Sequence, residues 1–120
     1  MIKTGYFAKQ KYYKARGFYV VSISRWSPKW FSGVECKELA PSVSLLSDYK
    51  YKNLSEEEYE RRFRLEMNPE NVKRILDSLV SEYGDKICLC CYEKNGDFCH
   101  RHILADIMKE NYGMIIEELI

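Results

Sequence analysis

Two short, almost uninterrupted apolar segments constrain the fold of this chain more than any other feature. Phe18–Ser24 is rich in β-branched and aromatic residues, and Lys86–Cys91 is apolar from its second residue onward. Strands of this kind are covered on both faces, as in parallel sheets flanked by helices. We therefore expect both segments to lie inside one sheet.

Helical segments separate the predicted strands. A helix is expected over residues 55–67, because its Ser-Glu-Glu-Glu start is a capping box. A second is expected over residues 68–84, because Asn-Pro suits the N-cap and the first helical position and glycine the end. The last predicted helix has Asp97 as its N-cap and ends near Gly113.

The two ends of the chain supply further predicted strands, Met1–Phe7 and Met114–Leu119. This alternation predicts an α/β fold, with residues 1–120 forming a single compact three-layer domain, Rossmann-like, around a mostly parallel sheet. Ligands of such sheets bind beyond the carboxyl ends of the strands. The turn after Cys91 and the loop after Ser24 leave from carboxyl ends, so we expect them to face one crevice.

The composition is that of a globular protein, with 46% hydrophobic and 31% charged residues. No apolar stretch approaches the roughly 20 residues that span a bilayer, and the first residues do not resemble an export signal. We therefore expect a cytoplasmic protein without a membrane partner. Its five cysteines, an odd number, are expected to be reduced thiols.

The net charge of +1 hides an uneven distribution. Residues 1–37 contain eight Lys or Arg and one Glu, whereas residues 38–120 contain eleven basic and seventeen acidic residues. This asymmetry favours an anionic partner for the first segment. The basic, tyrosine-rich stretch Lys9–Arg16 is either a nucleic-acid-binding segment or simply a solvated surface, and the small net charge makes nucleic acid the weaker interpretation.

Candidate catalytic residues lie in the turn after the Lys86–Cys91 strand and at the start of the last helix. Cys99 is expected in the first helical turn, where free N–H groups stabilise a thiolate. Cys91 lies nearest the turn, on the strand face opposite Cys88 and Cys90. Glu93 suits proton transfer or recognition of a base or ribose. His100 maps to the buried helix face, where it is either a structural hydrogen-bonding group or a general base.

Candidate ligand-binding residues include cations from two regions. Arg25 and Lys29 belong to the loop that follows the second strand, where Trp26 is able to stack on a base. Arg101 maps to the border of the last helix's buried face. Together these cations are suited to a phosphate group.

No cofactor is expected, and a protein metal site is the less favoured alternative. It would use Cys90 or Cys91, Cys99, and His100 or His102 as zinc ligands. The usual closely spaced cysteine pair of a zinc motif is missing, and His102 maps to the solvent-facing side of the helix.

These residues also carry a family resemblance. The chain resembles the bacterial and phage family called "domain of unknown function 488" in the segments Thr4–Ala8, Val21–Arg25, Pro28–Trp30, Lys37–Pro41, Tyr59–Phe63, Cys91–Lys94 and Phe98–His102. The resemblance implies an α/β fold with a pocket formed by Arg25, Lys29, Cys91, Glu93, Cys99, His100 and Arg101. We add Tyr92, the middle residue of the Cys-Tyr-Glu motif, as a ligand-binding candidate.

The expected function is the binding of a small, anionic, nucleotide-like ligand, with or without catalysis. One alternative is a thiol-dependent enzyme that uses Cys99 or Cys91 as nucleophile and His100 as base. The other is nucleic-acid binding through the basic N-terminal segment. The sequence specifies no oligomeric state.

Overall fold

A five-stranded parallel sheet forms the centre of the computed structural model, which describes residues 1–120. Its strand order is β3-β2-β4-β1-β5. The strands are β1 (Ile2–Tyr6), β2 (Tyr19–Ser22), β3 (Val34–Glu35), β4 (Ile87–Cys91) and β5 (Glu117–Glu118). The helices are α1 (Gln10–Ala15), α2 (Val43–Tyr51), α3 (Glu56–Glu66), α4 (Pro69–Tyr83) and α5 (His100–Tyr112), with 3₁₀ turns at Phe7–Lys9 and Lys37–Leu39.

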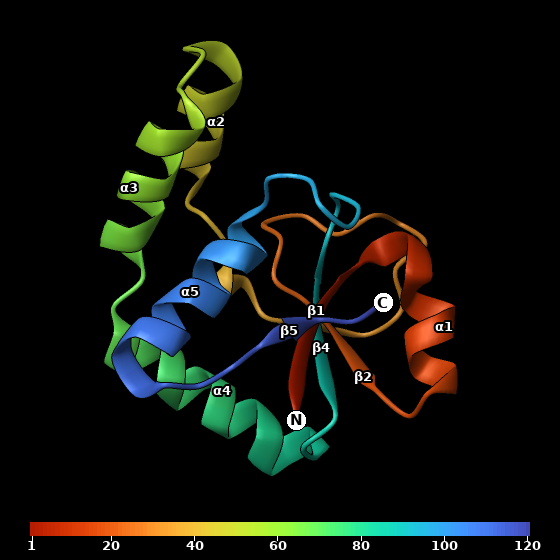
Figure 1. Cartoon of the computed structure of the whole chain (residues 1–120). Helices are drawn as coiled ribbons and strands as arrows, with labels where there is room; N and C mark the ends of the chain where they lie inside the picture. Colours follow the sequence, from red (N-terminus) through yellow and green to blue (C-terminus); the bar gives the residue numbers. More distant parts are fainter.

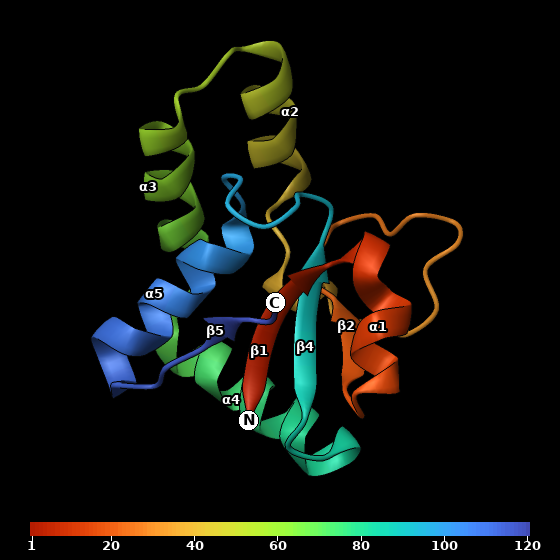
Figure 2. The same cartoon turned by 45° about the vertical axis from the view of Figure 1, so that its right-hand side comes forward.

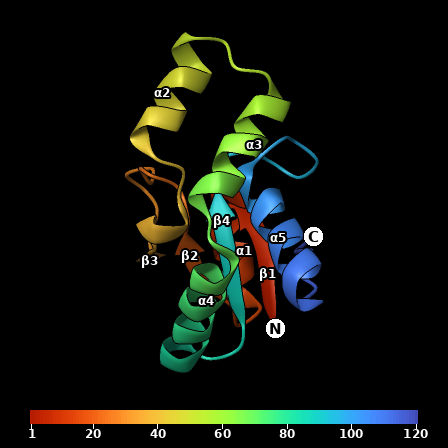
Figure 3. The ribbon, with the colours of Figure 1, turned by 90° about the vertical axis from the view of Figure 1, so that its left-hand side faces the viewer.

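The helices form layers on both faces of the sheet (Figure 1). Helix α1 covers one face, while α4 and α5 cover the other. Helices α2 and α3 extend beyond the carboxyl edge of the sheet (Figures 2 and 3). The fold is therefore the three-layer α/β arrangement that the alternating segments predict.

Strand β4 is central and buried along its whole length. Cys88 and Cys90 belong to the smaller core under α1, whereas Ile87 and Leu89 belong to the larger core under α4 and α5. This alternation confirms the predicted strand and the shared face of Cys88 and Cys90. It also directs Cys91 toward α5.

A close backbone approach fixes α1 against the sheet. A Cβ atom on Gly5 would lie 2.6 Å from the Tyr13 ring, so only glycine fits beside it. The buried Tyr13 hydroxyl accepts a hydrogen bond from the Tyr6 N–H at 3.2 Å. The ring thereby joins the α1 layer to β1.

The structure confirms the predicted N-terminal caps of α3 and α4. The Ser55 hydroxyl accepts the Glu58 N–H at 3.1 Å, and the Asn68 side chain accepts the Asn71 N–H at 3.1 Å. The Glu58 carboxylate, however, pairs with Arg61 rather than completing the capping box.

Two predicted boundaries change in the structure, and three elements appear that the sequence did not predict. Helix α5 begins at His100 with Cys99 as its N-cap, and the predicted cap Asp97 instead donates its N–H to Lys94 in the preceding turn. Short elements appear where none was expected, namely α1, α2 and β3. The final strand covers only Glu117–Glu118 of the predicted Met114–Leu119.

None of the helices has the length and apolar character needed to cross a membrane.

Candidate functional site

A cavity of about 350 Å³ lies at the carboxyl ends of β2 and β4. Its wall combines the segment after β2, helices α2 and α3, the turn after β4 and the start of α5. The loop after Ser24 and the turn after Cys91 therefore face one cavity, as the sequence predicts.

Five aromatic side chains from separate segments contribute to the cavity wall. They are Trp26, Tyr49, Tyr59, Tyr92 and Phe98. The Tyr59 ring lies 4.8 Å from Tyr49 and 5.4 Å from Phe98, measured between centroids. Trp26 and Tyr92 are 58% and 52% exposed, so they offer accessible faces at the cavity rim.

His100 has a defined tautomer beside this wall. Its Nε2 atom lies 2.6 Å from the carbonyl oxygen of Ile23, which only accepts, so Nε2 carries the proton. Burial lowers the pKa of His100 to about 4 despite this hydrogen bond, which keeps the ring neutral at pH 7. The Nδ1 lone pair is consequently free, 3.7 Å from the Cys99 sulfur.

Cys91 and Cys99 meet where β4 ends and α5 begins. Their sulfur atoms lie in bonding contact, as in a disulfide, and their Cα atoms are 7.7 Å apart. Cys36, Cys88 and Cys90 are free. The prediction of five reduced thiols is thus wrong for this pair, because the fold places both side chains on the same side of the sheet.

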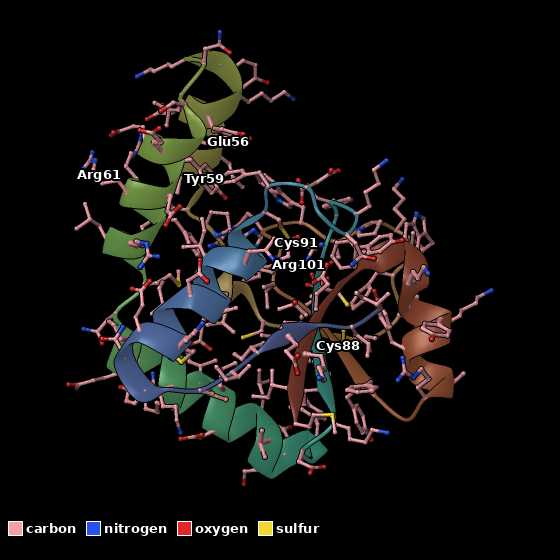
Figure 4. All side chains as sticks on the ribbon, viewed as in Figure 1. Glu56, Tyr59, Arg61, Cys88, Cys91 and Arg101 are labelled. Carbon is pink, nitrogen blue, oxygen red and sulfur yellow. A yellow bond between two sulfur atoms is a disulfide. The ribbon has the colours of Figure 1, made fainter.

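Arg101 lies deeper than the sequence predicts. It is fully buried and donates from Nε and Nη2 to the Glu118 carboxylate at 3.1 and 2.8 Å. Its Nη1 donates to the Cys91 sulfur at 3.1 Å, and Figure 4 shows Cys91 and Arg101 next to each other. Arg101 does not line the cavity, and its charge is already paired with Glu118.

Glu118 remains ionised inside this network. Burial alone would raise its pKa, but hydrogen bonds from Arg101, Thr4 and Asn95 outweigh that effect and lower the pKa to about 2. The carboxylate is therefore a permanent counter-charge for Arg101 at neutral pH.

Only some of the remaining sequence candidates line the cavity. Arg25, Tyr92 and Glu93 line the cavity with Cys99 and His100, whereas Lys29 and Cys91 do not. Arg25 also donates to the backbone oxygens of three loop residues, Lys37, Ala40 and Pro41.

A cluster of three possible metal ligands stands next to the cavity. Ligand atoms of Cys91, Cys99 and His100 all lie within 4.8 Å of one another, and all three residues are buried. Cys90 faces the opposite core and His102 lies outside the cluster. Of the alternatives that the sequence left open, the structure therefore favours Cys91 over Cys90 and His100 over His102 as possible metal ligands.

Several wall residues escaped sequence reasoning. Tyr49 and Lys50 belong to the unpredicted α2, and Tyr59 lies on the predicted α3. These residues are far from Glu93 in the sequence, so no local pattern indicates that they line the same cavity. The Tyr59–Phe63 segment was nevertheless part of the family resemblance. The basic stretch Lys9–Arg16 includes α1, across the sheet from α5.

Comparison with known proteins gives one family. A family model described as "Active DUF488-N3 subclade", DUF488-N3a, matches residues 10–112. No curated protein and no solved structure matches the chain. Because the match spans both sides of the cavity and most of the sequence, the chain belongs to the DUF488 family, named for domain of unknown function 488.

Proposed function

We propose that this protein is a cytoplasmic binder of a nucleotide-like, phosphate-bearing ligand, which occupies the cavity at the carboxyl ends of β2 and β4. The observation that carries the proposal is the gathering of five aromatic side chains, from separate segments, around one cavity with polar groups. Flat rings stack on nucleobases of any sequence, because every base has a π-face.

The polar residues supply the complementary contacts. Glu93 lines the same cavity, and a carboxylate there accepts hydrogen bonds from a base amino group or ribose hydroxyls. His100 is held neutral with an acceptor nitrogen. These groups orient a ligand whose ring is held by aromatic contacts.

Two cationic side chains of the cavity wall, Arg25 and Lys50, are suited to bind the phosphate of the ligand. Arg25 uses Nε and Nη2 for backbone contacts, while its Nη1 has no partner. Lys50 is exposed and lines the same cavity. No side chain caps α5, so its first N–H groups add donors near Cys99. In this proposal Lys50, rather than Lys29, is the lysine that binds the phosphate group.

The test is calorimetric titration with the adenosine, guanosine, cytidine and uridine 5′-monophosphates and the corresponding nucleosides. Trp26→Ala should weaken binding by roughly 5- to 150-fold, the effect of losing about 1–3 kcal/mol of base stacking. Lys50→Ala should weaken the nucleotides more than the nucleosides, because only the former carry phosphate.

Two matched controls come from the loop after β2. Trp30 is as exposed as Trp26 but lies outside the cavity, and so does Lys29. Trp30→Ala and Lys29→Ala should leave the affinity unchanged. Equal losses for Trp26→Ala and Trp30→Ala, or no binding to any of the eight compounds, would overturn the proposal.

Thiol-dependent catalysis is the second candidate, and the 3.7 Å approach of Cys99 Sγ to His100 Nδ1 favours it. The word "active" in the matching family's description also favours catalysis. After reduction, this function requires rapid alkylation of Cys99 or Cys91 by iodoacetamide and protection by a bound ligand. Slow labelling of both would contradict it.

Nucleic-acid binding remains a prediction from the sequence alone. Its basic residues lie on and around α1, away from the cavity. A salt-insensitive affinity for oligonucleotides would remove it.

A further inference from the structure

We infer that the reduced side chains of Cys91, Cys99 and His100 form a binding site for a single zinc-type divalent ion, with one coordination position open toward the cavity. This inference rests on the sulfur and imidazole cluster and not on the nucleotide proposed above. Metal binding measured without any nucleotide therefore separates the two proposals.

The first support is the choice and convergence of the ligands. Two thiolates and one imidazole are ligands that zinc prefers, and their atoms already lie within 4.8 Å of one another. The Cys91 and Cys99 Cα atoms are 7.7 Å apart, beyond the span of about 4.4–6.8 Å usual for a disulfide. Once the pair is reduced and its sulfurs separate, an ion between them accommodates this wider backbone spacing.

The second support is the orientation of His100. A metal-binding histidine usually donates its other ring N–H to a carbonyl or carboxylate, which fixes the tautomer. His100 does this through Nε2 to the Ile23 carbonyl at 2.6 Å. The remaining Nδ1 lone pair is 3.7 Å from Cys99 Sγ, close to the separation of roughly 3.6 Å expected between ligands in a tetrahedral zinc site.

The third support is the charge balance around the sulfurs. Metal binding requires deprotonated thiols, and the Arg101 Nη1 at 3.1 Å from Cys91 stabilises negative charge on that sulfur. Glu118 compensates the arginine. A divalent cation with two thiolates, one guanidinium and one carboxylate gives a neutral buried set.

Three protein ligands leave one position for water or for a ligand group, which is characteristic of catalytic rather than structural zinc sites. Cys99 and His100 line the cavity, so this position faces it. Glu93 shares that cavity without belonging to the cluster, as a carboxylate suited to exchanging a proton with metal-bound water.

The test starts from full-length protein reduced under anaerobic conditions and titrated with zinc, then with cobalt, in the absence of nucleotide. Native mass spectrometry should find one zinc per chain that is lost on denaturation. Cobalt should give thiolate charge-transfer absorption and the strong visible bands of tetrahedral coordination.

Variants locate the site. Cys99→Ser and His100→Gln should each weaken zinc binding by at least the 10- to 100-fold that even changes behind the ligands cost. Cys36→Ser is the matched control, because Cys36 is also buried and free but lies outside the cluster, and it should bind zinc normally. The cobalt spectrum of the unmodified protein keeps the test valid if a variant fails to fold.

Failure of the reduced protein to bind zinc or cobalt would overturn the inference. Binding that survives in Cys99→Ser, or that is lost equally in Cys36→Ser, would place the metal elsewhere and would also overturn it.

Discussion

Cys88 and Cys90 lie on one face of β4 and Cys91 lies on the other, and the two faces give these cysteines different surroundings. The first two belong to an apolar core with Phe7, Tyr13 and other side chains under α1. Cys91 instead contacts Arg101 and Cys99 under the start of α5. All three cysteines are almost completely buried, so burial does not distinguish them.

The difference shows that chemistry in this site depends on neighbouring charge. The side-chain interaction with Cys90, together with burial, raises the pKa of Cys88, which keeps that thiol protonated and inert. On the opposite face, a guanidinium and a helix N-terminus lie beside the Cys91–Cys99 pair and would stabilise negative charge on its sulfurs after reduction. One strand thus supplies structural thiols to one core and chemically competent sulfur to the other side.

The largest expected effect comes from removing the charge on the Cys91 side. Arg101→Met leaves the Glu118 carboxylate without its buried partner, and such a loss costs about 3–5 kcal/mol of stability. Urea unfolding at pH 7 measures this change. Adding Glu118→Gln to the variant should recover much of the lost free energy, because it removes the uncompensated charge. If Arg101→Met alone lowers the free energy of unfolding by less than about 1 kcal/mol, Arg101 and Glu118 do not form a buried ion pair.

The next effect is a pH dependence specific to the Cys91 side. The pKa of His100 falls from 6.5 to about 4 on folding, so between these values the unfolded chain binds more protons. Stability should therefore be complete above pH 6.5 and decrease by about 3 kcal/mol as the pH falls to 4.

Urea unfolding of the unmodified protein and His100→Gln across this range isolates the contribution. The variant should lack most of the decrease. Its remaining slope includes His102, the only other histidine, whose pKa is also lowered by burial. Parallel curves for the two proteins would show that His100 is not held neutral by the fold.

The smallest effect belongs to the apolar face. Cys90→Ala removes one small buried group and should cost about 0.5–1.5 kcal/mol, as other small deletions in a core do. Its zinc affinity should match that of the unmodified protein, because Cys90 faces away from the metal cluster. A large loss of zinc affinity in this variant would break the contrast between the two faces.

Much of the fold was predictable because the sequence patterns that specify its helices and strands are local. The cap at Ser55 and the Asn68-Pro69 start specify α3 and α4, and the apolar run specifies β4. The meeting of the Ser24 loop with the Cys91 turn follows from the direction of parallel strands. These features need only neighbouring residues and general rules of sheet topology.

The missed features depend on contacts distant in the sequence. Arg101 is buried because Glu118, on β5, pairs with it. Tyr59 reaches the cavity because α2 and α3 extend beyond the sheet edge. Helix α1 has only six residues, of which Gln10 and Tyr13 are buried, so it has no apolar periodicity to detect.

The most direct test of the proposed function uses the two tryptophans as internal probes. Each indole N–H gives its own signal in a ¹H–¹⁵N correlation spectrum, and the chain has only Trp26 and Trp30. Single Phe substitutions assign the signals, and each mononucleotide of the panel is then added. We predict that at least one nucleotide shifts the Trp26 signal in a saturable manner and leaves Trp30 in place. Shifts at Trp30 alone, or no shift at Trp26 with any nucleotide, would contradict binding in the aromatic cavity.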